Sequence, residues 1–353
     1  MVLIINPGST STKIALFSGD KEIFSSTLRH NAEELGQFGN ITEQFSFRKE
    51  IIVSALDNAG YKLDDIKIIM ARGGLIDPVQ SGIYEVNSRM IRDLSNPSRK
   101  QHASNLGALI ANDIALRIPG CKAYIADPVV VDELQDIARI SGHPFFKRES
   151  IFHALNQKAI AKAYAEECGV PYEELRLIVV HMGGGISVGA HCNGKVIDVN
   201  QALSGDGPFS PERSGSLPAN KLAEICFSGK YSCDEVSKII SGKGGYFAYL
   251  GTTDAGEVEK KAIAGEEEFL LIRNAMGYQI AKEIGAQAAV LEGRVDIIIF
   301  TGGIAYNASF VEYISNYVRF IADIKVYPGE DEMKALAINA ERILNGSEKA
   351  KDY

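Results

Sequence analysis

The chain has 353 residues, of which 46% are hydrophobic and 23% are charged, and its formal net charge at pH 7 is −8. This length is large for a single hydrophobic core, so we expect two domains in an ordinary globular protein. The negative charge argues against a general nucleic-acid or acidic-membrane binder, although a locally basic site could still bind a small polyanion.

Five cysteines are scattered along the chain without a CxxC pair. Neither a zinc site nor a disulfide framework is indicated, which favours a reducing, cytoplasmic setting. Only four apolar residues, VLII, lie between Met1 and Asn6, too few for a signal-peptide core. No stretch is long and apolar enough to span a bilayer. We therefore expect a cytoplasmic protein with no membrane partner.

The first predicted elements are three strands, at 2–6, 12–18 and 21–28, joined by tight turns. The first turn lies in NPGSTSTK, residues 6–13. Asn, Pro, Gly and Ser are ordinary turn formers, so a plain hairpin is one interpretation. The other is a phosphate-binding loop made of hydroxyls, backbone N–H groups and the ammonium of Lys13.

The same arrangement returns in LIVVHMGGGISVGAHCNGKVIDV, where an apolar strand ends at His181 and a glycine turn follows. Asn6 precedes Gly19 by thirteen positions, and His181 precedes Gly194 by thirteen. A second pair of segments, IKIIMARGGL (66–75) and DIIIFTGGI (296–304), has two buried-type strands that run into Gly-Gly. The two matched pairs occur in the same order, which indicates an internal duplication.

Helical patterns at 103–117, 153–168, 268–290 and 332–345 alternate with the strands, which indicates an α/β fold. We expect a first domain at 1–150 plus 331–353 and a second domain at 151–330. The last helix should pack on the first domain, and the polar tail NGSEKAKDY should be frayed. The two glycine-bearing hairpin turns should face a common cleft.

Both hairpin turns have residues suited to phosphate. Phosphates need close backbone N–H groups, which favours Gly183, Gly184 and Gly185. Ser9 and Ser11 can donate from their hydroxyls, and Lys13 adds a positive charge. Two such turns at equivalent positions favour phosphate binding over two unrelated hairpins.

Other candidates have a structural alternative. FTGGIAYN (300–307) could open a ligand-binding helix N-terminus or be a packing turn. Asp127 ends a strand where a carboxylate suits a metal. The acids of GEDEM (329–333) suit a helix N-terminus or, through water, Mg²⁺. His153 and His181 could be ordinary helix-face and strand-end residues.

IINPGSTSTK resembles the first signature of the acetate kinase and butyrate kinase family, within the acetate and sugar kinase, heat-shock cognate and actin superfamily. VVHMGGG, LGTTDAGEV and FTGGIAYN follow in the family's order, so the resemblance covers nearly the whole chain. It implies two duplicated actin-like ATPase domains, ribonuclease H-like, with an active-site cleft between them. NPGSTS, ARGGL and RSGSLP resemble the butyrate kinases more than the acetate kinases.

The resemblance also implies roles for the matched positions. The implied catalytic residues are Arg72, His153, His181 and Arg213. The implied phosphate-binding residues are Asn6, Ser9, Ser11, Lys13, Gly183, Gly184 and Gly185. The implied adenosine contacts are Asp254, Gly302, Gly303, Ile304 and Asn307. The implied metal-side acids are Asp127 and Glu332, with Asp331 as the alternative to Glu332. Phe152 is a candidate wall of the acid pocket, with core packing as the alternative.

The implied reaction is ATP + butanoate ⇌ ADP + butanoyl phosphate, by direct in-line transfer with Mg²⁺, in a homodimer or higher homo-oligomer. A carboxylic acid with a pKa of about 4–5 is already ionised at pH 7, so no general base is needed. Charge cancellation and alignment are needed instead. A branched-chain acid kinase of the isobutyrate type differs only in pocket shape and stays open. A nucleotide switch of the actin or chaperone kind, without an acid substrate, is the alternative from another class.

Overall fold

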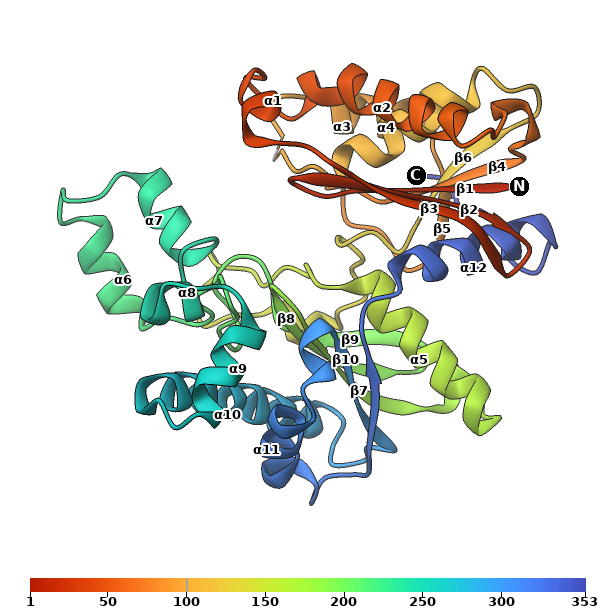
Figure 1. Cartoon of the computed structure of the whole chain (residues 1–353). Coiled ribbons are helices and arrows are strands. Elements are labelled where there is room, and N and C mark those ends of the chain that lie inside the picture. Colours follow the sequence, from red (N-terminus) through yellow and green to blue (C-terminus); the bar gives the residue numbers. More distant parts are fainter. Residues whose placement is uncertain (100) are drawn as a thin grey trace. The chain divides into compact units, whose positions relative to one another are not determined.

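The computed structural model describes residues 1–99 and 101–353. Their contacts form two compact units, Met1–Val131 with Asp331–Tyr353, and Asp132–Glu330. Residues 132–150 therefore group with the second unit. Each unit holds one mixed β-sheet with helices packed against it, which confirms the predicted α/β class (Figure 1).

The sheet of the first unit has the strand order β3-β2-β1-β4-β6-β5. Figure 1 shows α2, α3 and α4 on one face of this sheet and α12 on the other. The strands are β1 (Val2–Pro7), β2 (Ser11–Ser18), β3 (Lys21–Arg29), β4 (Ile68–Arg72), β5 (Ile83–Glu85) and β6 (Lys122–Ala126). The helices are α1 (Ala32–Gly36), α2 (Phe45–Asn58), α3 (Ser88–Ser95), α4 (Asn105–Ala115) and α12 (Glu332–Leu344).

The sheet of the second unit has the order β11-β10-β7-β8-β9, with α5 and α10 on opposite faces (Figure 1). The strands are β7 (Arg176–Met182), β8 (Ile186–Cys192), β9 (Lys195–Val199), β10 (Ile297–Gly302) and β11 (Ile324–Pro328). The helices are α5 (Ala154–Cys168), α6 (Ala219–Cys226), α7 (Cys233–Ile240), α8 (Gly245–Leu250), α9 (Ala255–Ile263), α10 (Glu267–Val290) and α11 (Ala308–Val318). Short 3₁₀ helices lie at Thr42–Gln44, Leu63–Asp65, Asp136–Arg139, Tyr172–Glu174 and Gly303–Tyr306.

The predicted duplication is confirmed by the topology. In each unit a three-stranded antiparallel meander pairs through its first strand with a parallel strand, β1 with β4 and β7 with β10. Both meanders also have a register shift two residues before the second turn, between Leu16 and Phe17 and between Ala190 and His191. The two units are therefore variants of one α/β design.

The equivalence of Gly19 with Gly194 is wrong by one residue. Four residues, 8–11, lie between the last paired residues of the first hairpin, but only three, 183–185, lie in the second. The second turns then align Gly19 with Asn193, and both residues have positive φ, 62° and 52°. The equal thirteen-residue spacing arises because a shorter loop is compensated by a shifted turn.

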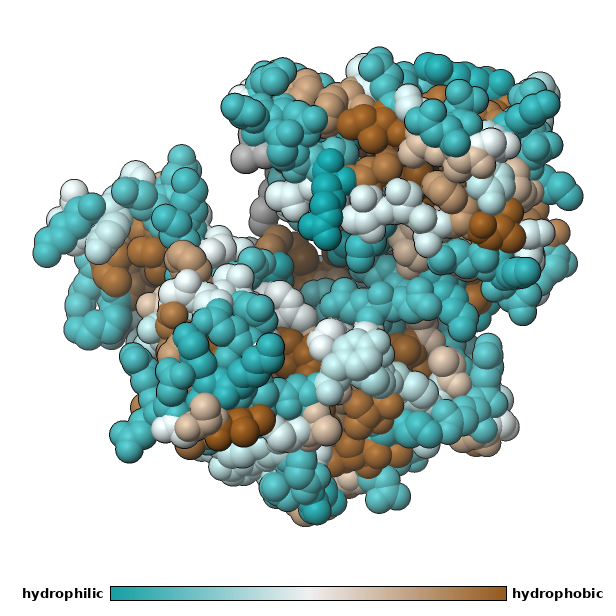
Figure 2. All heavy atoms as spheres, in the orientation of Figure 1, coloured by the Kyte–Doolittle hydropathy of each residue, from teal (hydrophilic) through white to brown (hydrophobic). Residues whose placement is uncertain are grey.

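Apolar side chains explain why these segments become buried strands. All six residues of β1 and all seven of β8 are buried, as expected for central strands covered on both faces. Helix α4 packs on β4 and β6 through a nearly continuous buried surface that includes Gly107, whose added Cβ would meet the carbonyl of Arg72 at 2.6 Å. On the face in Figure 2, hydrophilic residues cover most of the surface of both units.

The predicted helices are confirmed within a few residues of their expected ends, and α12 packs on β1 and β4. The predicted fraying of the tail is wrong. The N–H of Lys351 donates to the carbonyl of Ile83 at 2.8 Å, and the Tyr353 hydroxyl donates to Oδ2 of Asp93 at 2.7 Å. Among the described residues, no helix has the length and apolar character needed to cross a membrane.

Candidate functional site

In the first unit, the loop after β1 presents the predicted phosphate-binding residues. The N–H of Gly8 donates to the carbonyl of Ser11 at 2.7 Å, which closes the loop and leaves Ser9 exposed. Asn6 and Lys13 lie directly opposite each other in the pairing of β1 with β2. The loop lines a pocket of about 620 Å³. Its lining residues are Thr10, Ser11, Lys13, Thr27, Arg29, His30, Asn31 and Glu34.

The ends of two parallel strands bring three predicted residues together. Asn6 lies one residue before the end of β1, and Arg72 ends the neighbouring β4. Asn6 Nδ2 donates to Oε2 of Glu332 at 2.7 Å, and Arg72 Nη1 donates to the same oxygen at 3.3 Å. Because Glu332 opens α12, that helix positions its carboxylate at the carboxyl end of the sheet.

The other predicted metal-side acid, Asp127, has a different setting. It follows β6 with φ at +36° and is 4% exposed. Its Oδ1 accepts from the hydroxyl of Ser81 at 2.6 Å and from the N–H of Gly82 at 2.8 Å. Asp331, the alternative to Glu332, caps α12 by accepting from the N–H of Lys334 at 3.0 Å.

No group of three or more His, Cys, Asp or Glu side chains in the described residues is arranged to hold a metal. Mg²⁺ usually takes one or two carboxylates and completes its shell with water and substrate phosphates. The donor set of Asp127 and Glu332 fits this second mode.

In the second unit, both predicted histidines lie beside the glycine turn. The ring of His153 stacks on the ring of His181 with 3.8 Å between centroids. His181 bonds through Nδ1 to Oδ1 of Asn156 at 2.8 Å, and its Nε2 lies 3.0 Å from Oε1 of Glu330. His153 bonds through Nδ1 to the hydroxyl of Ser187, also at 2.8 Å. Ser187 pairs with His181 across β7 and β8, so it holds the position that Lys13 has in the first unit.

Neighbouring side chains leave no room for a Cβ at two positions of the glycine turn. A Cβ on Gly183 would lie 2.7 Å from Oε1 of Glu330, and a Cβ on Gly185 would overlap Nη1 of Arg213. Gly184 has no such conflict. The sequence predicts that these glycines allow close approach of a phosphate. In the structure, two of the three also give room to Glu330 and to Arg213.

Arg213 reaches the glycine turn with a buried donor that has no partner in the described residues. Its Nη1 donates to the carbonyl of Ala202 at 2.6 Å, while Nη2 lies 3.8 Å from Oε1 of Glu212. Its Nε is buried and has no hydrogen-bond partner in the described residues. Burial lowers the pKa of this guanidinium, and Glu212 opposes the shift. A buried donor without a partner is costly, so Nε can donate to an acceptor on a ligand, such as a phosphate oxygen.

A pocket of about 650 Å³ joins the glycine turn to most of the predicted adenosine residues. Asp254 caps α9 at this pocket, accepting from the N–H of Gly256 at 2.8 Å, and Asn307 caps α11. The lining residues that the sequence analysis named are Gly183, Gly184, Asp254, Gly303, Ile304 and Asn307. Those it missed are Pro211, Thr253, Ala255, Gly256, Glu259, Lys260, Tyr306 and Glu330. Most of these neighbour the named positions in LGTTDAGEV and FTGGIAYN, which is the signal that could have found them.

Two predicted residues have a different place. Gly302 does not line this pocket; it has φ at +89°, and an added Cβ would overlap the backbone of Met182. Its role in the structure is the close approach of β10 to the end of β7. Phe152 precedes α5 and is 2% exposed, a burial that suits either a core residue or the wall of a small enclosed site.

The model of the acetokinase family matches residues 144–335. The chain is 56% identical to butyrate kinase 2 and 54% identical to butyrate kinase 1 of Clostridium acetobutylicum, each over 352 residues, covering 100% of this chain and 99% of the relative. Among solved structures, Porphyromonas gingivalis acetate kinase aligns with a TM-score of 0.80 at 21% identity, covering 97% of this chain and 99% of that one. A propionate kinase from Francisella tularensis aligns with a TM-score of 0.75 at 17% identity, covering 96% and 98%. These structures establish the fold, and the sequence matches establish that the chain belongs to the acetokinase family.

Proposed function

We propose that this protein is an ATP-dependent butyrate kinase that catalyses ATP + butanoate ⇌ ADP + butanoyl phosphate by direct in-line transfer. The observation that carries the proposal is the 56% identity to a butyrate kinase along the entire chain. Butyrate kinase 1 of the same organism supports it at 54%.

The nucleotide has a suitable pocket in the second unit. Its volume of about 650 Å³ lies within the usual range for small-molecule sites. We assign the adenosine to the side formed by Asp254, Ile304 and Asn307, and the phosphates to Gly183 and Gly184. The N-termini of two helices, α9 and α11, open at this pocket, and Asp254 and Asn307 cap them there.

The acid substrate needs no base, because a carboxylate is already ionised near neutral pH. The transfer instead joins two anions, so it requires positive charge and donors aimed at the transferring phosphoryl group. We assign this task in the first unit to Asn6, Lys13 and Arg72, with Ser9 and Ser11. In the second unit we assign it to Arg213, His153 and His181. The free Nε of Arg213 supports this assignment.

We further propose that the reaction uses Mg²⁺ with ATP. Glu332 and Asp127 would hold the ion, which would neutralise part of the charge on the phosphates. The protein's own share is to fix Glu332 through the donors of Asn6 and Arg72.

A homodimer or higher homo-oligomer and a cytoplasmic location belong to the same proposal. Four large apolar side chains within ten residues, Ile137, Ile140, Phe145 and Phe146, are 70–86% exposed. Clustered exposed apolar side chains mark surfaces that associate. All five cysteines are free, which suits a reducing compartment.

Trapping the product with hydroxylamine tests the activity. Enzyme, ATP and MgCl₂ are incubated with acetate, propionate, butyrate, isobutyrate or valerate, and the hydroxamate is measured. Butyrate should give the largest kcat/KM. A larger value for isobutyrate would reassign the enzyme to branched acids. ATP binding without hydroxamate from any acid would instead indicate a nucleotide switch.

A further inference from the structure

All four carbonyl oxygens of the loop at residues 8–11 are taken by donors of the first unit. Arg48 Nη1 donates to the carbonyl of Gly8 at 2.8 Å and to that of Ser11 at 3.3 Å. Its Nη2 donates to the carbonyl of Ser9 at 2.8 Å. The N–H of His30 donates to the carbonyl of Thr10 at 2.9 Å.

The amide groups of the same loop have the opposite character. Within the described residues, neither the N–H of Ser9 nor that of Thr10 donates to a protein acceptor. Both residues are exposed, so these groups face solvent. A loop whose carbonyls are held inward and whose N–H groups are free is suited to bind an anion.

Arg48 itself is 0% exposed, and its whole guanidinium is in use. Its Nε and Nη2 both donate to Oε1 of Gln44, at 3.0 and 2.9 Å, and Nη1 also reaches Oγ1 of Thr12 at 3.2 Å. None of its hydrogen-bond acceptors among the described residues is a carboxylate. Burial lowers the pKa of Arg48, yet an arginine stays charged in proteins.

The neighbouring His30 does not act as a counter-ion for Arg48. His30 is 4% exposed and bonds through Nε2 to Oγ1 of Thr12 at 3.0 Å. Burial and the charge of Arg48 lower the pKa of His30, so the ring is neutral near pH 7. The guanidinium of Arg48 therefore stays beneath the loop with no carboxylate among its hydrogen-bond partners in the described residues, and a buried charge without a paired counter-ion is expensive.

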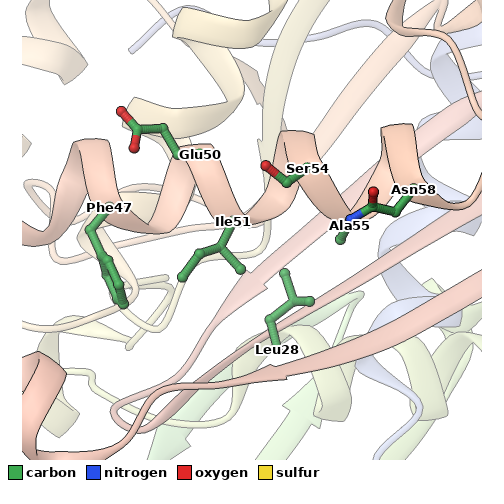
Figure 3. Close-up of a pocket in the computed structure, with 7 residues that line it drawn as sticks. All are labelled: Leu28, Phe47, Glu50, Ile51, Ser54, Ala55 and Asn58. Carbon is green, nitrogen blue, oxygen red and sulfur yellow. The ribbon is translucent and has the colours of Figure 1, made fainter.

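The helix that carries Arg48 is fixed in the core. The buried residues of α2 are Arg48, Ile52 and Leu56, spaced four apart, so the arginine occupies the core-facing stripe of the helix. An adjacent side of α2 turns toward β3, where Phe47 and Ile51 point to Leu28 around a shallow pocket (Figure 3). An aliphatic residue would be the ordinary choice at position 48.

We propose that Arg48 is a positioning residue of the phosphoryl site: it turns the amide groups of the loop outward and supplies the positive charge that an incoming anion completes. The inference rests on the proposed function, in which that anion is the transferring phosphoryl group. Arg48 acts through the loop and does not touch the substrate.

The test compares two variants of α2. Arg48→Met keeps a long side chain and removes the guanidinium, and Leu56→Ala damages the same buried stripe away from the loop. Arg48→Met should lower kcat for butyrate by about a hundredfold, the cost of a small misplacement of reacting groups. The Kd for ADP, whose pocket lies in the second unit, should change less than twofold. Leu56→Ala should lower Tm and keep kcat within threefold of the wild type.

Chemical rescue separates positioning from a general folding defect. In Arg48→Ala, 20–50 mM guanidinium chloride (about the non-denaturing range) should raise kcat at least tenfold, and equal NaCl should not. Arg48→Lys, the variant to use if the others do not fold, keeps the charge without the fork and should still lose about tenfold. A kcat within threefold of the wild type for Arg48→Met or Arg48→Lys, or no rescue of Arg48→Ala, overturns the inference. Failure of the proposed function is seen separately, as no hydroxamate from the wild type.

Discussion

Nε2 of His181 lies 3.0 Å from Oε1 of Glu330, at the glycine turn of the second unit. The other ring nitrogen faces Oδ1 of Asn156, so both nitrogens of this imidazole meet oxygen atoms. Glu330 also lines the pocket that we assign to the nucleotide, so a negative charge stands where phosphates are proposed to bind.

Glu330→Gln should therefore strengthen the binding of ADP without Mg²⁺. Removing one negative charge at a partly exposed site is worth about 1 kcal/mol, or roughly fivefold in Kd. With Mg²⁺ present the gain should shrink, because the cation already offsets the charge. Isothermal titration with and without MgCl₂ measures both values. Glu312→Gln, on α11, is the control; equal Kd values for Glu330→Gln and the wild type without metal would contradict the repulsion argument.

Arg213→Ala should lower kcat by about a hundredfold or more, because a donor aimed at developing charge is lost. Arg213→Lys should recover little, since one ammonium cannot replace both the donor to Ala202 and the free Nε. Steady-state kinetics and Tm are measured together, with the exposed Arg319 replaced by Ala as control. Turnover near the wild-type value in Arg213→Ala would remove this residue from the mechanism.

The duplicated sheets were predictable because buried strands and glycine turns leave local signals. The β1–β2 and β7–β8 hairpins repeat the order of apolar run, turn and strand, and residues 6 and 181 proved equivalent. The loop-length difference was not predictable, since the thirteen-residue spacings agree by compensation. Pairing register depends on contacts between strands, which the linear spacing does not contain.

Arg48 shows more clearly what could not be predicted from the sequence alone. In sequence it opens the run RKE at 48–50, and such a run usually lies on a solvated helix face. Its four-residue spacing from Ile52 and Leu56 places it on the buried stripe, and this spacing is the sequence signal for its burial. Apart from Gln44, one turn away, its partners lie some 36–40 residues away in the first hairpin, and only the fold brings them together.

The metal-side acids can be distinguished by neutral replacements. Glu332→Gln should raise the Mg²⁺ concentration needed for half-maximal rate, because it removes the charge and keeps the shape. Asp331→Asn, one residue away, still caps α12 and should leave that concentration unchanged. Asp127→Asn should also raise it, although its Oδ1 contacts with Ser81 and Gly82 can be kept by an amide. Magnesium titrations of the three variants give the ranking, and an unchanged value for Asp127→Asn would make that residue structural.

Acid should destabilise the second unit through His191. Burial, and secondly the charge of Lys158, hold the pKa of His191 well below its ordinary value near 6.5. With Nε2 facing Oε1 of Gln157, Nδ1 accepts from the Tyr172 hydroxyl, and a proton on Nδ1 would remove that acceptor. Below pH 6.5 the unfolded chain gains a proton that the folded chain does not, and the free energy of unfolding falls. The slope is at most about 1.4 kcal/mol per pH unit.

Urea unfolding between pH 7.5 and 5 measures this slope. His191→Gln should reduce it, while replacement of the exposed His143 by Gln should not. His30, whose pKa burial also lowers, should leave a residual slope in the first unit. Identical pH profiles for the wild type and His191→Gln would show that the native ring takes up the proton freely.

The acid pocket gives the last prediction. Butyrate exceeds acetate by two methylenes, whose burial at about 0.8 kcal/mol each favours butyrate by about 1.6 kcal/mol. That is about 15-fold in kcat/KM, so acetate should be a poor substrate and still a measurable one.

If Phe152, buried beside His153, is a wall of this pocket, Phe152→Ala should shift the preference toward longer acids and leave the Kd for ADP unchanged. Phe17→Ala, which empties a similarly buried site near the turn that joins β2 to β3, should lower stability and keep the wild-type ranking of acids. If Phe152→Ala behaves like Phe17→Ala, losing about 3–5 kcal/mol of stability without a new ranking, Phe152 is a core residue and the wall lies elsewhere.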